Sequence, residues 1–141
     1  MFSLENFNFA QSIAGLLPFL AYFGTSLGMV MVFAVIYTFV TPHDEIGEIK
    51  KNNVSAAISF VGAMLGFTLP LMTAMNVSTN FYDFLVWGAV AAIAQIILFF
   101  SIRIVFPRMI CRIKDGEVAM GILVAGVSIL VGLANSTSMI P

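Results

Sequence analysis

The residues of this sequence that could do chemistry are polar side chains set within long apolar stretches. Gln95 is the clearest example, because it lies in the middle of the apolar stretch that begins at Asp83. An amide at that depth can line a polar pathway for ions or solutes, or it can hydrogen-bond to a neighbouring helix and fix the packing. Amide side chains commonly act in the second way, so the packing interpretation is favoured.

A second group of polar side chains gathers near one end of the apolar stretches. It comprises Thr25, Ser26, Thr68, Thr73, Asp83, Asn135, Ser136 and Thr137. Pro70 lies beside them and should kink its helix, because a proline cannot donate to the carbonyl of Gly66, four residues earlier. One interpretation of the group is a small polar vestibule at the outer face. In the other, the hydroxyls bond to their own helices and Asp83 caps its own helix, and the residues leave both open.

The sequence offers little that could support catalysis or bind a metal ion. The run His43-Asp44-Glu45 sets one imidazole beside two carboxylates, but a closed metal site needs further well-placed ligands. The single histidine has no evident nucleophile partner, and no serine lies in a Gly-x-Ser-x-Gly turn. The lone cysteine, Cys111, cannot form an internal disulfide. We therefore expect a protein that is not an enzyme and holds no metal and no cofactor.

The composition of the chain indicates what solvent surrounds these residues. Of the 141 residues, 60% are hydrophobic and 9% are charged. Soluble domains contain about 45–50% apolar and about 25% charged residues. A chain of this size cannot hide so much apolar surface from water, so its surface must face lipid. The net charge of −1 and the lack of a long Lys/Arg run exclude a nucleic-acid-binding protein.

Four stretches are long and apolar enough to cross a bilayer as helices. They run over residues 18–40, 54–75, 83–106 and 118–140. Each is longer than the about 20 residues that a helix needs to span a hydrocarbon core of about 30 Å. Asn80 is expected to cap the third helix, together with Asp83. The sequence thus predicts an all-α membrane protein with four transmembrane helices.

The basic residues of the chain cluster on one side of the predicted membrane domain. They are Lys50, Lys51, Arg103, Arg108, Arg112 and Lys114. Connections rich in Lys and Arg stay in the cytoplasm, which places loops 41–53 and 107–117 inside and both termini outside. All of these basic residues except Arg103 would then face anionic lipid headgroups or an acidic partner.

The chain shows a weak internal repeat when it is aligned with itself at the sequence separation between Lys50 and Lys114. The same shift pairs Ile49 with Ile113, Val54 with Val118, Ile58 with Ile122 and Gly62 with Gly126. We interpret this as two tandem helical hairpins, over residues 1–75 and 76–141, that point the same way across the membrane. Such a parallel repeat lacks the inverted symmetry on which small transporters usually depend.

Small residues recur at the spacing of one helical turn. The glycines concerned are Gly24, Gly28, Gly62, Gly66, Gly88, Gly121 and Gly126. Faces of this kind let helix backbones approach closely and drive association by van der Waals packing. Four short helices cannot easily use all of these faces internally, so we expect a homo-oligomer or a membrane partner subunit. The alternative is that the faces only close the four-helix bundle.

Several of these residues together match the pattern of a known family. They are the His43-Asp44-Glu45 run, the stretch from Asn53 to Leu71 with Gly62, Gly66 and Pro70, the spacing of Asp83, Trp87 and Gln95, and the closing Gly132-Leu133-Ala134-Asn135. From about Leu27 to Met139 the chain resembles the YjfL-like family of bacterial inner-membrane proteins, which is domain of unknown function number 350. The resemblance implies paired two-helix units in a bacterial inner membrane and supplies no activity. Members of the family are often encoded near membrane-stress proteins, which implies a link to envelope stress.

These observations favour a structural role over catalysis. No Asp, Glu, Lys or Arg lies at mid-membrane, which argues against the small proton-coupled exporters, whose relays need such groups. We expect an oligomeric inner-membrane protein that serves as a structural or assembly component. The alternative function is a small ion or solute channel or transporter formed at an oligomer axis.

Overall fold

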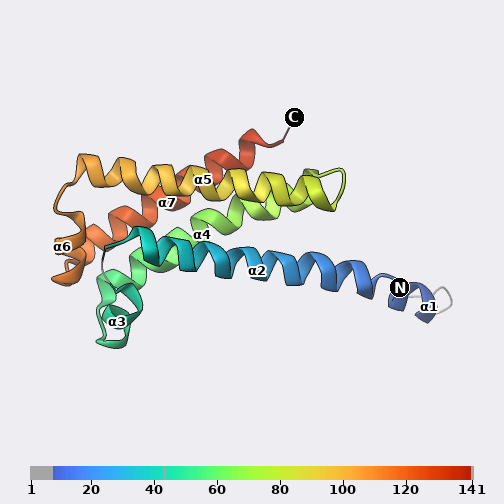
Figure 1. Ribbon diagram of the computed structural model, residues 1–141, viewed down its shortest axis with the longest axis horizontal. Coiled ribbons are helices and arrows are strands. Elements are labelled where there is room, and N and C mark those ends of the chain that lie inside the picture. Colours follow the sequence, from blue (N-terminus) through green and yellow to red (C-terminus); the bar gives the residue numbers. More distant parts are fainter. Residues whose placement is uncertain (1–7, 43, 141) are drawn as a thin grey trace, which may run out of the picture.

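The computed structural model describes residues 8–42 and 44–140, and every regular element within these ranges is a helix (Figure 1). The helices are α1 (Phe9–Ala14), α2 (Leu16–Val40), α3 (Glu45–Lys50), α4 (Val54–Val77), α5 (Phe81–Val105), α6 (Met109–Lys114) and α7 (Val118–Ser138). The chain therefore alternates long helices with short connecting ones.

The four long helices correspond to the four predicted membrane spans. Four helical segments, of which the first combines α1 and α2, are long and apolar enough to cross a membrane. The bounds of α2, α4, α5 and α7 differ from the predicted ones by at most two residues. The prediction of an all-α protein with four membrane-spanning helices is thus confirmed.

Side chains that accept hydrogen bonds from the first turn determine where several helices begin. Asn53 caps α4 by accepting from the backbone N–H of Ala56, with a donor–acceptor distance of 3.1 Å. Asn80 caps α5 by accepting from the N–H of Asp83 at 3.0 Å. The Asp83 carboxylate in turn accepts from the N–H of Thr79, one residue before the position expected for a capping box.

The long helices form one bundle in which α4 is central and α2 is peripheral. In Figure 1, α3 and α6 lie at the same end of the bundle, which we call the loop end. The helices α4 and α7 run in the same direction and make the most extensive interhelical contact. The main contact of α2 with the rest of the bundle is to α4, and it is much smaller.

The two halves of the chain do not form separate bundles within the described residues. The most extensive contact joins α4 of the segment 1–75 to α7 of the segment 76–141. Each half does contain two long helices separated by a short one. The tandem repeat itself stays a prediction.

Candidate functional site

The Gln95 side chain, near the middle of α5, joins three of the four long helices. It is 4% exposed, and its Nε2 donates to the carbonyl oxygen of Gly66 in α4 at 2.8 Å. The same nitrogen donates to the carbonyl of Ser128 in α7 at 3.2 Å. Gln95 therefore makes the interhelical hydrogen bonds that the packing interpretation requires.

The Gly66 carbonyl is available to Gln95 because of Pro70. An ordinary residue at position 70 would donate its N–H to this carbonyl, but proline has no N–H. Gly132 of α7 lies directly against the backbone of Gly66, where an added Cβ would overlap it. Gly66, Pro70, Gln95, Ser128 and Gly132 thus form one packing centre, which we call the Gln95 node.

Gly132 is a member of this node that the sequence analysis did not include among the packing glycines. A signal for it was present, because Gly132 follows Ser128 by one helical turn and so continues a small-xxx-small face. The other packing glycines divide into two groups. A Cβ added at Gly62, Gly66, Gly88 or Gly121 would meet a neighbouring helix, whereas at Gly24, Gly28 or Gly126 it would meet nothing within 4 Å.

Most side chains of the outer polar group hydrogen-bond to their own helices or caps. The Thr68 hydroxyl donates to the carbonyl of Met64 at 2.8 Å, and the Thr137 hydroxyl donates to that of Ala134 at 2.9 Å. Asp83 accepts from the turn that precedes its own helix. These bonds satisfy the three side chains within their own helices and turns.

The structure distributes the outer polar group over several surfaces. Thr68 lines a groove of about 550 Å³ between α2 and α4. Thr25 lines a different groove, of about 530 Å³, between α2 and α5. Deeper in the bundle, the hydroxyls of Thr73 and Ser136 hydrogen-bond across the α4–α7 contact.

Asn135 is a member of the outer group whose buried amide donor is left unused among the described residues. Its Nδ2 is buried and has no hydrogen-bond partner among the described residues. An orphaned amide inside a membrane domain is costly, so Asn135 is the outer residue with the strongest reason to meet a further polar group.

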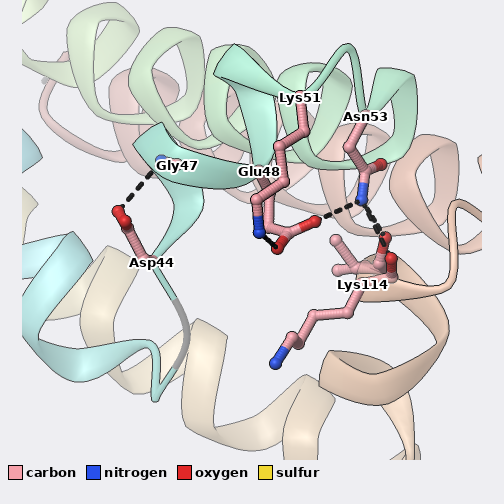
Figure 2. A network of polar contacts seen from close by, with 7 residues as sticks. Asp44, Gly47, Glu48, Lys51, Asn53 and Lys114 are labelled. Atoms are coloured by element: carbon pink, nitrogen blue, oxygen red, sulfur yellow. Dashed lines mark hydrogen bonds and ion pairs between the residues drawn. The ribbon is translucent and has the colours of Figure 1, made fainter.

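A polar network at the loop end ties the first connection to the second (Figure 2). The Nδ2 of Asn53 donates to the carbonyl of Ile113 at 2.9 Å and to that of Lys114 at 3.1 Å. It also donates to Glu48 at 3.3 Å, and Glu48 forms an ion pair with Lys51 at 3.1 Å. Hydrogen bonds from Lys51 and then Asn53 hold the pKa of the Glu48 carboxyl below its usual value.

Glu45 is a buried residue of the loop end that was not predicted from the sequence. Its side chain is buried, with 1% exposed, although it follows the N-cap of a short connecting helix. Burial raises the pKa of this carboxyl from 4.5 to about 8. Tyr37, which is also buried, lies near enough to interact with Glu45 electrostatically. The sequence does not indicate which of the two adjacent carboxylates, Asp44 or Glu45, faces the interior.

The basic residues of the loop end differ in how they are held. Arg112 Nε donates to Glu117 at 2.6 Å, and Lys51 is paired with Glu48. Lys50, Arg108 and Lys114 are exposed. Among the described residues, no three His, Cys, Asp or Glu side chains could hold a metal ion together, and His43 lies outside those residues.

Comparisons with known proteins place the chain among bacterial membrane proteins. The profile of DUF350, Domain of Unknown Function, matches residues 11–139. The UPF0719 inner membrane protein YjfL of Escherichia coli strain K12 is 33% identical over 124 residues, which are 88% of this chain and 94% of the relative. The protein of the same name from Escherichia coli O157:H7 matches to the same extent. No solved structure gives a significant match. The resemblance seen in the sequence is therefore confirmed, and the match begins closer to the N-terminus than expected.

Proposed function

Because the chain belongs to the DUF350 family, a family of unknown function, we propose a role from its own packing: a non-enzymatic, oligomeric scaffold of the inner membrane. The long helix α2 provides the surface through which copies associate. The loop end, which the basic residues predict to be cytoplasmic, serves as the surface on which partners assemble.

The observation that carries this proposal is the low burial of α2. Of its 25 residues, only Phe33 and Tyr37 are buried, and both lie in the half nearer the loop end. Gly24 and Gly28, in the other half, have open space where a Cβ would be. A glycine pair at this spacing lets a second helix approach to backbone contact, which is how helices associate in lipid.

The polar groups inside the bundle favour a scaffold function over ion or solute conduction. The Gln95 amide nitrogen donates to the carbonyls of Gly66 and Ser128, in two neighbouring helices. Nearer the loop end, the hydroxyls of Ser59 and Ser101 donate to carbonyls of their own helices. These three side chains of a single copy therefore bond to helix backbone and not to a permeating solute.

The alternative function is a small channel or transporter formed at an oligomer axis. The observation that favours it is the buried Nδ2 of Asn135, which has no partner within the described part of the chain. A pathway between copies would have to begin at this amide, because Thr25 and Thr68 line separate grooves beside α2.

Self-association through α2 can be measured with the native cysteine as the labelling site. Cys111 is the single cysteine and is exposed, so donor and acceptor dyes can be attached to separate batches of protein. Energy transfer between copies in vesicles, at decreasing protein-to-lipid ratio, then gives the association constant. We expect the wild-type protein to associate and Gly28→Leu to weaken the association by about tenfold or more.

The matched control is Gly126→Leu, because Gly126 also has open space around it but lies in α7. This variant should change the association constant by less than about twofold. A wild-type protein that stays monomeric at high protein density would contradict the scaffold proposal. So would a Gly28→Leu variant that associates as well as the wild type.

A flux measurement separates the scaffold from the channel. Liposomes that contain the wild-type protein should carry no more Na⁺, K⁺, Cl⁻ or H⁺ than empty liposomes. An ion flux that Asn135→Leu or Gln95→Leu abolishes, while the helical content is retained, would establish the channel in place of the scaffold.

A further inference from the structure

The elbow between α5 and α6 contains a hollow that combines arginines with apolar side chains. It has a volume of about 390 Å³ and is lined by Val105, Phe106, Pro107, Arg108, Met109 and Arg112. The hollow begins where α5 ends, because Phe106 is the C-cap of that helix and Pro107 follows it. We call this hollow the elbow site.

The elbow site lies at the boundary between hydrocarbon and water. The last turn of α5 exposes Ile104 at 79% and Val105 at 68%, which is the pattern of a helix end that faces lipid tails. Arg108 and Arg112 follow within the next two turns. Basic side chains directly beyond the end of a transmembrane helix lie at the depth of the lipid phosphates.

The two connections at the loop end differ in net charge. The connection 107–117 has three basic and two acidic residues, which gives a net charge of +1. The connection 41–53 has two basic and three acidic residues, which gives −1 with histidine neutral and every carboxyl ionised, and zero when the Glu45 carboxyl keeps its proton. An anion is therefore attracted to the elbow site and not to the neighbouring connection, although both contain basic residues.

We propose that the elbow site binds the phosphate of an anionic phospholipid, whose acyl chains lie along the exposed side of α5. Arg108 and Arg112 are four residues apart, and their guanidinium groups suit the planar, bidentate recognition of phosphate. Arg112 is positioned by its Nε bond to Glu117, which leaves its terminal nitrogens to donate to the headgroup. Phe106 and Pro107 supply the apolar contacts to the glycerol and the upper acyl chain.

The proposed lipid site is independent of the oligomer. All of its lining residues come from the end of α5, the turn 106–108 and α6 of one copy. A monomeric protein would bind the lipid, and an oligomer without lipid preference would still be a scaffold. A protein without lipid preference would therefore leave the association measurement unaffected.

Lipid selectivity can be measured by electron spin resonance with lipids spin-labelled on the acyl chain. The protein is reconstituted in phosphatidylcholine vesicles, and the motionally restricted fractions of labelled phosphatidylglycerol and labelled phosphatidylcholine are compared. We expect the wild type to prefer the anionic lipid at least about fivefold. The double variant Arg108→Gln/Arg112→Gln should reduce the ratio to about one.

The matched control is Lys50→Gln/Lys51→Gln, which removes the same charge from the other connection and should keep the preference. Arg108→Gln alone avoids loss of the Arg112–Glu117 pair and should lower the preference while retaining wild-type helicity. Equal loss in the arginine and lysine variants would overturn the proposal in favour of general surface attraction. An unchanged preference in the arginine variants would also overturn it. Displacement of the labelled lipid by inorganic phosphate at constant ionic strength would show a free-phosphate site instead.

Discussion

The helices α2 and α4 are of nearly equal length and both are strongly apolar, yet they are used in opposite ways. Eleven residues of α4 are buried, against two of α2. Both helices carry a glycine pair at the same spacing, Gly62 and Gly66 in α4 and Gly24 and Gly28 in α2. The pair in α4 packs against α7, while the pair in α2 has open space. The fold therefore depends on one small-residue face and leaves the other for association.

The difference in burial between α2 and α4 predicts which glycine substitutions destabilise the protein. Gly132→Leu should have the largest effect, because any side chain at Gly132 overlaps the backbone of Gly66 and separates α4 from α7. We expect a loss of about 3 kcal/mol in the free energy of unfolding. The measurement is an SDS titration of the reconstituted protein followed by circular dichroism.

Two glycines with open surroundings provide the reference for that experiment. Gly24→Leu and Gly126→Leu add the same side chain where nothing lies within 4 Å, and each should change the unfolding free energy by less than about 0.5 kcal/mol. If Gly24→Leu destabilised the monomer as much as Gly132→Leu, the contrast between α2 and α4 would be wrong.

The next largest effect concerns Glu45, which lies at the loop end of the bundle. The pKa of Glu45 is about 8 in the folded protein and near 4.5 when unfolded, so the folded state keeps its proton over that range. Keeping Glu45 protonated contributes its full stabilisation to the folded state at low pH. This contribution falls by about 1.4 kcal/mol per pH unit between the unfolded and folded pKa values, and it is lost as the pH rises through about 8.

Glu45→Gln removes this titration and identifies its source. Between about pH 6 and about pH 8 the wild type should lose about 2 kcal/mol of stability relative to Glu45→Gln. SDS titrations of both proteins at several pH values give the difference directly. Parallel pH profiles for the two proteins would mean that Glu45 ionises normally in the folded state.

The smallest effect tests the hydrogen bonds of the Gln95 node. Gln95→Leu should cost about 1 kcal/mol, because interhelical hydrogen bonds in membranes contribute little each. In a Pro70→Ala background the cost should fall by about half, since the backbone N–H that this substitution restores can then satisfy the Gly66 carbonyl. Ser101→Ala serves as the control, because that hydroxyl is exposed and bonds to its own helix. Equal costs in the two backgrounds would show that Pro70 and Gln95 are not coupled.

The sequence was informative wherever a feature depended on neighbours along the chain. Span lengths follow from composition, and the cap at Asn80 follows from a side chain that reaches the next turn. The carbonyl freed by Pro70 was also predictable, because the missing bond is local. Its pairing with Gln95 was not, since this depends on which faces of α4 and α5 meet.

Burial was the property that local patterns could not predict. The glycine pairs of α2 and α4 look alike in sequence, and only packing distinguishes them. The N-cap residue Asp44 is exposed, whereas the carboxyl of the next residue, Glu45, is buried. In an apolar background, the usual contrast between inward apolar and outward polar residues is lost, so the direction of a side chain is hard to infer.

The N-terminal extension of α2 has a consequence for the membrane itself. The apolar segment Phe9–Val40, which combines α1 and α2, contains 32 residues. As a straight helix it would be about 48 Å long, against a hydrocarbon thickness of about 30 Å. The segment must therefore tilt, or α1 must turn along the headgroups, to remove the mismatch. A thinner or thicker bilayer would change that tilt, so bilayer thickness acts directly on the one helix that the bundle holds least.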